Sequence, residues 1–218
     1  MQDETFKYPR PAVGQIFAVS SLFFAAAAMA LSQVYKSAVP TLKTLSAVYA
    51  LVAGTYYLIS VHRIHRILEQ ATDGRYPVRP WPAVLFGLVP FYNLYWLFRW
   101  TGQIALFMNG LKKEKLIDQN RYGLAMFAGY LLGVFIPGFS QIVAFAVLGN
   151  ITGHLKPLLD GQALPVETGD EEFDPKTGVI VAIGGSIFMI AIISSVMTQA
   201  SKELNAPPAN PAASVQKS

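Results

Sequence analysis

Few residues of this chain could take part in chemistry, and most of them lie beside apolar stretches. His62 and His65 are three positions apart, near one face of a helix, and His154 ends a later apolar segment. Two histidines on one helix face can bind a metal ion, and histidines on facing helices can bind haem. Histidines and arginines also collect where membrane helices end, without any chemical role. A histidine-dependent membrane enzyme or haem protein is thus one hypothesis, although we expect no metal and no cofactor.

A second group of residues interrupts the uncharged run 81–98. Positions 89–96 read Val-Pro-Phe-Tyr-Asn-Leu-Tyr-Trp, which places a proline, an asparagine and four aromatic rings together. Proline removes a helical N–H, and an amide in hydrocarbon requires an internal hydrogen-bond partner. These residues could line a small polar cavity, or they could form an aromatic belt around one bonded amide. Asn93 could cap the helix after the break or bond the carbonyls that Pro90 frees. The candidates are Pro90, Asn93, Tyr95 and Trp96 and, at a second break, Pro137 and Gly138.

Several kinds of chemistry are excluded or disfavoured by what the sequence lacks. It contains no cysteine, which excludes disulfides, thiolate catalysis and cysteine-bound metals. It contains neither a nucleotide-binding fingerprint nor a recognisable Ser/His/Asp arrangement. No lysine, aspartate or glutamate lies inside an apolar run, which argues against proton-coupled transport. The net charge of +4 is spread over short loops, so we expect no nucleic-acid partner.

The composition indicates that membrane helices position these residues. The chain has 218 residues, 53% of them apolar and 14% charged, and its mean hydropathy is +0.39. About 20 apolar residues cross the hydrocarbon core as a helix. The uncharged runs 11–35, 44–61, 122–153 and 177–201 are long enough, and 81–98 is marginal. We predict an all-α integral membrane protein with four to five transmembrane segments, one or two of them proline-broken or re-entrant.

The expected organisation has five parts. They are a polar lead (1–10), a helical membrane core (11–156), an acidic loop (157–176), a C-terminal transmembrane helix (177–201) and a disordered tail rich in proline and alanine (202–218). Asp3 and Glu4, and an apolar run that continues past Ala30, favour a membrane span over a cleaved signal peptide at the start. Asp73-Gly74 is expected to end the helix that begins near residue 44.

The positive charges predict how the segments cross. If every apolar segment crosses once, the 17 lysines and arginines divide almost evenly between the two sides. If 81–108 enters and returns, alone or together with 122–155, most of them share one side. Positive residues collect on the cytoplasmic side, so a re-entrant 81–108 with a cytoplasmic N-terminus is favoured. The side of the C-terminus stays open.

Small residues predict close helix packing. Gly129 and Gly133, and likewise Gly149 and Gly153, share one face of a helix, where two backbones can approach each other. The partner helix could belong to this chain or to another membrane protein. We therefore expect the lipid bilayer and other membrane-protein subunits as partners.

The broken segment also resembles a known group of sequences. Asp73-Gly74, the Pro90-x-x-Asn93-x-Tyr95-Trp96 core, and Gly102 to Ala105 with Asn109 are similar to a signature in bacterial multi-pass membrane proteins of unknown function. Some members carry an N-terminal GYF-like domain that this chain lacks. The resemblance covers about residues 45–155. It implies a four-helix membrane core and no reaction, since none is assigned to the group.

Three functions are carried forward. The first is a non-catalytic scaffold, accessory or assembly subunit of a larger membrane complex, since small-residue faces and aromatics abound. The second is a small channel or transporter with its site at the breaks near Pro90, Asn93 and Pro137, and the third is the histidine-dependent protein. The expected location is a bacterial inner or intracytoplasmic membrane.

Overall fold

The computed structural model describes residues 6–32, 34–136, 138–160, 162, 165–166 and 173–204. Within these residues helices are joined by turns and short connections, and no strand occurs. The helices are α1 (Pro11–Ala30), η1 (Lys36–Ala38), α2 (Val39–Ala71), α3 (Pro80–Leu85), η2 (Phe86–Leu88), α4 (Tyr92–Lys112), α5 (Arg121–Phe135), α6 (Phe139–Leu159) and α7 (Lys176–Leu204). The predicted all-α class is confirmed for this part of the chain.

Among the residues that the structure describes, three helices are long and apolar enough to cross a membrane. They are α1, α2 and α6, whereas α5 and the stretch Lys176–Phe188 of α7 are apolar but shorter. These helices are compatible with a membrane protein. Three is fewer than the four to five segments expected from sequence. The described apolar stretch of α7, Lys176–Phe188, is shorter than a span, and the run 81–98 is divided between α3, η2 and α4.

The chain forms two compact units, Met1–Ala182 and Ile183–Ser218. The boundary lies inside the segment predicted as the last span, 177–201, and not before it. The first turns of α7 belong to the first unit because they pack on α4. A Cβ added at Gly178 would lie only 2.9 Å from the Cβ of Phe98. Of the second unit, the structure describes the remainder of α7.

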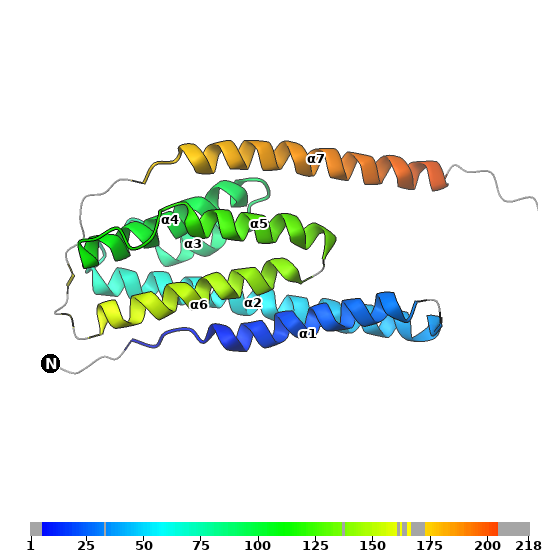
Figure 1. The fold of residues 1–218 in the computed structure, drawn as a ribbon, viewed down its shortest axis with the longest axis horizontal. Coiled ribbons are helices and arrows are strands. Elements are labelled where there is room, and N and C mark those ends of the chain that lie inside the picture. Colours follow the sequence, from blue (N-terminus) through cyan, green and yellow to red (C-terminus); the bar gives the residue numbers. More distant parts are fainter. Residues whose placement is uncertain are drawn as a thin grey trace, which may run out of the picture. The chain divides into compact units, whose positions relative to one another are not determined.

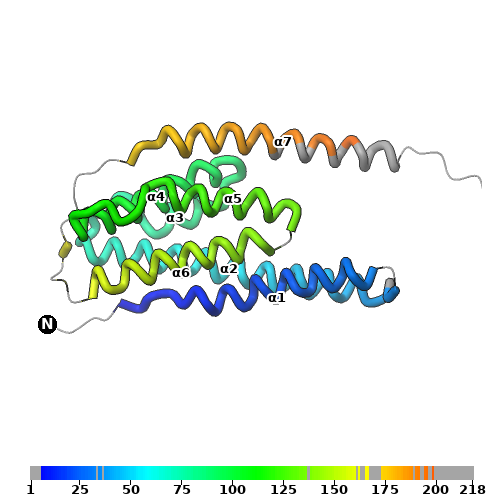
Figure 2. Tube along the Cα trace, in the orientation of Figure 1, coloured from blue at the N-terminus to red at the C-terminus, as the bar shows by residue number. Residues whose placement is uncertain are grey.

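The first unit is built from three antiparallel helix pairs, α1 with α2, α3–η2 with α4, and α5 with α6 (Figures 1 and 2). α1 also packs against α6, α3 against α2, and α4 against α5. One end of this unit, opposite the α1–α2 connection, holds four segments (Figure 1). They are the N-terminal segment, the connection after α2, the connection after α4 and the end of α6. Both proline-divided segments therefore reverse direction within the bundle.

The end of α2 is fixed by local hydrogen bonds. Thr72 ends the helix, and Asp73 follows with a φ of 53°. The Gly74 N–H donates to the Glu69 carbonyl at 2.8 Å, and the Asp73 N–H donates to the Gln70 carbonyl at 3.4 Å. This pair of bonds satisfies carbonyls that a helix end leaves free. The predicted stop at Asp73-Gly74 is confirmed.

The core lies between α2, α4 and α6. Its largest fully buried side chains include Trp100 and Phe145. α1 meets α6 where Gly14 faces the Phe145 ring so closely that any added Cβ would overlap it. α1 and α2 are joined by a reciprocal pair of bonds, since the hydroxyls of Ser21 and Ser46 each donate to the other residue's carbonyl at 3.0 Å. This bundle holds the helix breaks in place.

Candidate ligand-binding cavity

The tip between η2 and α4 is a tight reversal without glycine. Phe91 has φ 62° and ψ −42°, and the Tyr92 N–H donates to the Pro90 carbonyl at 2.7 Å. A hydrogen bond two residues back around a positive φ makes a γ-turn, a rare and strained one in this form. Pro90 sits exposed in this turn. The proline therefore reverses the chain rather than kinking one continuous helix.

Asn93 lies in the first turn of α4 but does not cap it. Its backbone N–H donates to the Val89 carbonyl at 3.0 Å, while no side chain caps the helix. The expectation that the Asn93 amide caps the second half-helix is therefore wrong. The γ-turn itself supplies partners for the first backbone groups of α4, which leaves the amide unused.

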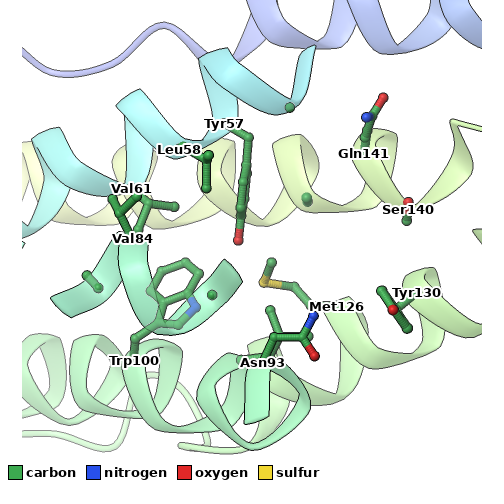
Figure 3. A pocket seen from close by; sticks show the side chains of 15 residues that line it. Tyr57, Leu58, Val61, Val84, Asn93, Trp100, Met126, Tyr130, Ser140 and Gln141 are labelled. Atoms are coloured by element: carbon green, nitrogen blue, oxygen red, sulfur yellow. The ribbon is translucent and has the colours of Figure 1, made fainter. Parts of the chain in front are cut away.

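The Asn93 side chain instead borders a cavity of about 190 Å³ in the first unit (Figure 3). The cavity lies between α2, α3, η2, α4, α5 and α6 and is partly open. Its lining residues are Gly54, Tyr57, Leu58, Val61, Ala83, Val84, Gly87, Asn93, Leu97, Trp100, Met126, Tyr130, Ser140, Gln141 and Ala144. In the close-up, Tyr57 reaches from α2 into the space between the helices, toward Met126 and Trp100 (Figure 3).

The polar groups of this cavity are largely free. In the described part of the chain, the Asn93 amide and the hydroxyls of Tyr57, Tyr130 and Ser140 make no hydrogen bond. Gln141 donates through Nε2 to the Ala50 carbonyl at 2.9 Å, and its buried Oε1 has no partner there. Polar groups inside a protein are normally satisfied, so these donors and acceptors are available to water or to a ligand.

The electrostatics of the cavity are neutral. None of the described residues that line it carries a formal charge. The groups outside the apolar helices that have a shifted pKa lie away from the cavity. Burial, and then the charge of Asp160, raise the pKa of Tyr8 to about 12. A backbone N–H donated by Asn120 lowers the pKa of the Asp118 carboxyl. Neither group contributes to the cavity, whose chemistry is hydrogen bonding by amides and hydroxyls.

The two aromatic candidates have structural roles. The indole N–H of Trp96, a buried side chain, donates to the Ala83 carbonyl at 2.9 Å and so ties α4 to α3. The Tyr95 hydroxyl accepts a bond of 3.2 Å from Arg99 on the same helix. Neither residue lines the cavity, so the structure joins only Asn93 of this group to it.

The second break, at Pro137 and Gly138, contributes to the cavity through the residues that follow it. Pro137 lies outside the described residues. Gly138 has a φ of 83°, which glycine adopts freely, and its Cα faces the backbone of α1 at Ala18 and Leu22. It does not line the cavity, but Ser140 and Gln141, which follow it in α6, do.

The three histidines are not brought together. His65 is fully buried, its Nδ1 lies 2.9 Å from the Val61 carbonyl, and its ring contacts Tyr76 and Trp100. His62 instead contacts Trp81, and His154 is exposed on α6. No group of three potential metal ligands occurs among the residues described. The geometry therefore offers no support to histidine-based chemistry.

The glycine pairs behave differently from each other. A Cβ on Gly129 would lie 2.6 Å from the Val143 Cβ, and one on Gly133 would lie 2.8 Å from the Ser140 Cβ, so this face packs within the chain. A Cβ on Gly149 would meet only Pro11, at 3.8 Å, and one on Gly153 would meet nothing within 4 Å. The expected packing role does not hold for Gly153 within the first unit.

Several cavity residues were not singled out from the sequence. Tyr57, Trp100, Met126 and Gln141 lie on four different helices, and each looks ordinary in its own segment. Of these four, only Gln141 could have been found from the sequence, because its amide, like that of Asn93, lies inside an apolar run.

Comparisons with protein-family models, with curated proteins and with solved structures give no match for this chain. The resemblance drawn from the Pro90-x-x-Asn93-x-Tyr95-Trp96 core stays a prediction. The function of the cavity is therefore proposed from its own geometry.

Proposed function

We propose that this chain is a non-catalytic, multi-pass membrane protein that binds a small uncharged molecule in the Asn93 cavity. The observation that carries the proposal is the Asn93 amide, which borders a cavity and has no hydrogen-bond partner in the described part of the chain. An amide left unpaired in an apolar bundle costs free energy, so a bound molecule or water must complete its bonds.

The properties of the ligand follow from the lining. A charged ligand is disfavoured because no lining residue could neutralise it, whereas amides and hydroxyls offer both donors and acceptors. The volume of about 190 Å³ exceeds the roughly 150 Å³ of an engineered cavity that takes up benzene. The ligand is thus a small neutral molecule with hydrogen-bonding groups on one side and an apolar body.

The orientation belongs to the same proposal. The end of the bundle with the N-terminal segment, the α2–α3 connection and the α4–α5 connection carries most of the described lysines and arginines. Positive residues collect on the cytoplasmic side, so this end faces the cytoplasm of a bacterial inner membrane and the α1–α2 connection faces away from it. The Asn93 cavity then lies between the two surfaces, at the level of the helix breaks.

The test compares wild-type protein with Asn93→Leu and Gln103→Leu, all purified from native membranes in mild detergent. Gln103 lies on the same helix and does not line the cavity, so it controls for loss of an amide from α4. Mass spectrometry of denatured samples should release the same small neutral molecule from wild type and Gln103→Leu and much less from Asn93→Leu. Thermal unfolding is measured in parallel, to show that all three proteins fold.

Two results would contradict the proposal. One is an identical set of released molecules from all three proteins. The other is a higher melting temperature for Asn93→Leu with no ligand lost, since replacing an unsatisfied amide by an apolar group stabilises a site that serves only packing.

Transport is the more demanding version of the same function. A channel or transporter for this molecule would use the same cavity, because it lies at the helix breaks and is partly open. Proteoliposomes are loaded with the released molecule, and efflux is compared for wild type and Asn93→Leu. Faster efflux through wild type alone favours transport, whereas equal rates restrict the function to binding.

An accessory-subunit role is the second candidate, and α7 favours it. The chain from Ile183 onward is a compact unit separate from the first, and its apolar residues Ile183, Ile187 and Phe188 are exposed. Membrane helices associate through such faces. Purification from the native membrane tests this role, since a stoichiometric larger complex that is lost on deletion of residues 183–218 would support it.

A further inference from the structure

A cluster of basic side chains lies where α2 leaves its apolar part and α3 begins. It contains His62, Arg63 and Arg66 of α2 and Arg79, the residue that precedes α3. Among the described residues, ion pairs join Lys112 to Glu114 and Lys115 to Asp118. The three arginines of the cluster therefore have no carboxylate partner in this part of the chain.

Two adjoining hollows open at this cluster, with His62, Arg66 and Trp81 in the walls of both. The first, of about 470 Å³, is completed by Glu69, Arg79, Pro80 and Pro82. The second, of about 360 Å³, is completed by Thr55, Leu58, Ile59, Arg63 and Val84. The pair thus runs from a polar, positively charged end to an apolar end.

The cluster lies at the depth of lipid headgroups. The uncharged stretch 44–61 directly precedes His62, and 18 helical residues extend about 27 Å, close to the thickness of the hydrocarbon core. The Trp81 side chain is 65% exposed, and its ring centroid lies 5.0 Å from that of His62. An exposed tryptophan beside arginines is typical of the membrane interface. The apolar hollow then points into the bilayer.

We propose that the two hollows bind one anionic phospholipid. Arg66 and Arg79 hold the phosphate group, which guanidinium groups bind with two parallel hydrogen bonds. An acyl chain follows Leu58, Ile59 and Val84 into the membrane. Basic pockets between membrane helices take anionic headgroups in this way.

The charge of the site selects the lipid class. The hollows are lined by three arginines and one carboxylate, that of Glu69. The lining therefore keeps a net positive charge after one phosphate group binds. A zwitterionic lipid would bring a further positive group into this surrounding, whereas a headgroup without one would not. Leu58 and Val84 line both this site and the Asn93 cavity, but none of the three arginines lines that cavity. The lipid proposal therefore does not rest on the function proposed for Asn93.

The experiment measures lipid binding to delipidated protein in detergent by native mass spectrometry. Phosphatidylglycerol and phosphatidylcholine with the same acyl chains are titrated in parallel, together with glycerol 3-phosphate and inorganic phosphate. Phosphatidylglycerol should bind most tightly. The double variant Arg66→Gln/Arg79→Gln should weaken its binding about thirtyfold, as expected for removing two basic groups from an anionic membrane surface.

Two further variants separate the charged from the apolar part of the site. Lys113→Gln/Lys156→Gln removes two exposed positive charges elsewhere and should bind like wild type. Ile59→Ser keeps the arginines and should weaken phosphatidylglycerol binding but leave phosphate unaffected. Equal binding of both lipids, equal binding by the arginine variant, or phosphate that binds as tightly as the lipid would each overturn the proposal.

Discussion

Two asparagines of α4 have opposite surroundings. The Asn93 amide borders a cavity and is free within the described part of the chain, whereas the buried Asn109 amide makes three hydrogen bonds. Asn109 Nδ2 donates to the Ile117 carbonyl at 2.8 Å, and its Oδ1 accepts from the N–H groups of Leu116 and Ile117 at 2.9 and 3.1 Å. One amide is available for binding, and the other closes the connection to α5.

Replacing Asn109 by leucine should destabilise the protein by about 2–4 kcal/mol, since the buried N–H and carbonyl of Ile117 would lose their partner. The Leu116 N–H would keep only its bond to the Glu114 carbonyl. Thermal unfolding in detergent should show a clearly lower melting temperature. The matched control is Gln70→Leu, because Gln70 is exposed and its side chain makes no hydrogen bond in the described structure. Equal melting temperatures for Asn109→Leu and the control would contradict the role of Asn109 as a clamp.

At the residue scale, the sequence showed which residues are unusual in their own segment. It did not show which residues from other helices lie beside them. Pro90 and Asn93 stood out because an apolar run should not contain them. The approach of Tyr57 and Gln141 depends on how α2 and α6 pack, which leaves no mark in either segment. The structural use of the Trp96 indole likewise depends on Ala83, thirteen residues earlier, and so on the geometry of the turn between them.

At the element scale, α5 and α6 pack closely against each other through the two glycines of α5. Gly129 faces Val143 and Gly133 faces Ser140, with almost no room for a side chain. Both glycines lie on the face of α5 that meets α6. Gly153, by contrast, has open space around it, although its sequence context is similar.

Gly129→Val and Gly153→Ala should therefore shift stability in opposite directions. The valine overlaps Val143 and forces the helices apart, at a cost of about 1–3 kcal/mol. The alanine meets nothing, and its better helix propensity contributes about 0.5–1 kcal/mol. Melting temperatures of the two variants in one detergent would check this. A loss of stability in Gly153→Ala would point to a contact on that face.

The sequence predicted the elements better than their pairing. Apolar runs and prolines placed the breaks before α4 and before α6, and the stop at Asp73-Gly74. Whether each break kinks a span or reverses it could not be decided locally. At the first break the chain reverses through the γ-turn at Phe91, and that reversal is supported by the packing of α3 on α2 and of α4 on α5.

At the scale of the whole molecule, the first unit brings its N-terminal segment and the α2–α3 and α4–α5 connections to one end (Figure 1). Charge counting favoured a returning 81–108 segment and left open whether 122–155 returns as well. In the structure both segments reverse. The same end therefore carries the basic residues that precede α1, follow α2 and follow α4.

This topology predicts the sides from which single cysteines react. The chain has no cysteine of its own, so Lys7→Cys, Lys115→Cys and Ser37→Cys give unambiguous labels at exposed positions. A membrane-impermeant maleimide should reach positions 7 and 115 from the same side and position 37 from the other. Labelling of 7 and 115 from opposite sides would show that segment 81–108 crosses the membrane.

The helix pairs differ in length, which would affect the bilayer in which we propose that the protein lies. α5 has 15 residues, about 22 Å of helix, and the α5–α6 turn stops short of the α1–α2 connection (Figures 1 and 2). The hydrocarbon core is about 30 Å thick. Lipids beside α5 and the α3–α4 turn must shorten or tilt to cover a smaller hydrophobic height than lipids beside α1. In the bilayer that we propose for this protein, this difference would produce a thin patch of membrane beside α5, and the patch would shorten the path from that surface to the Asn93 cavity.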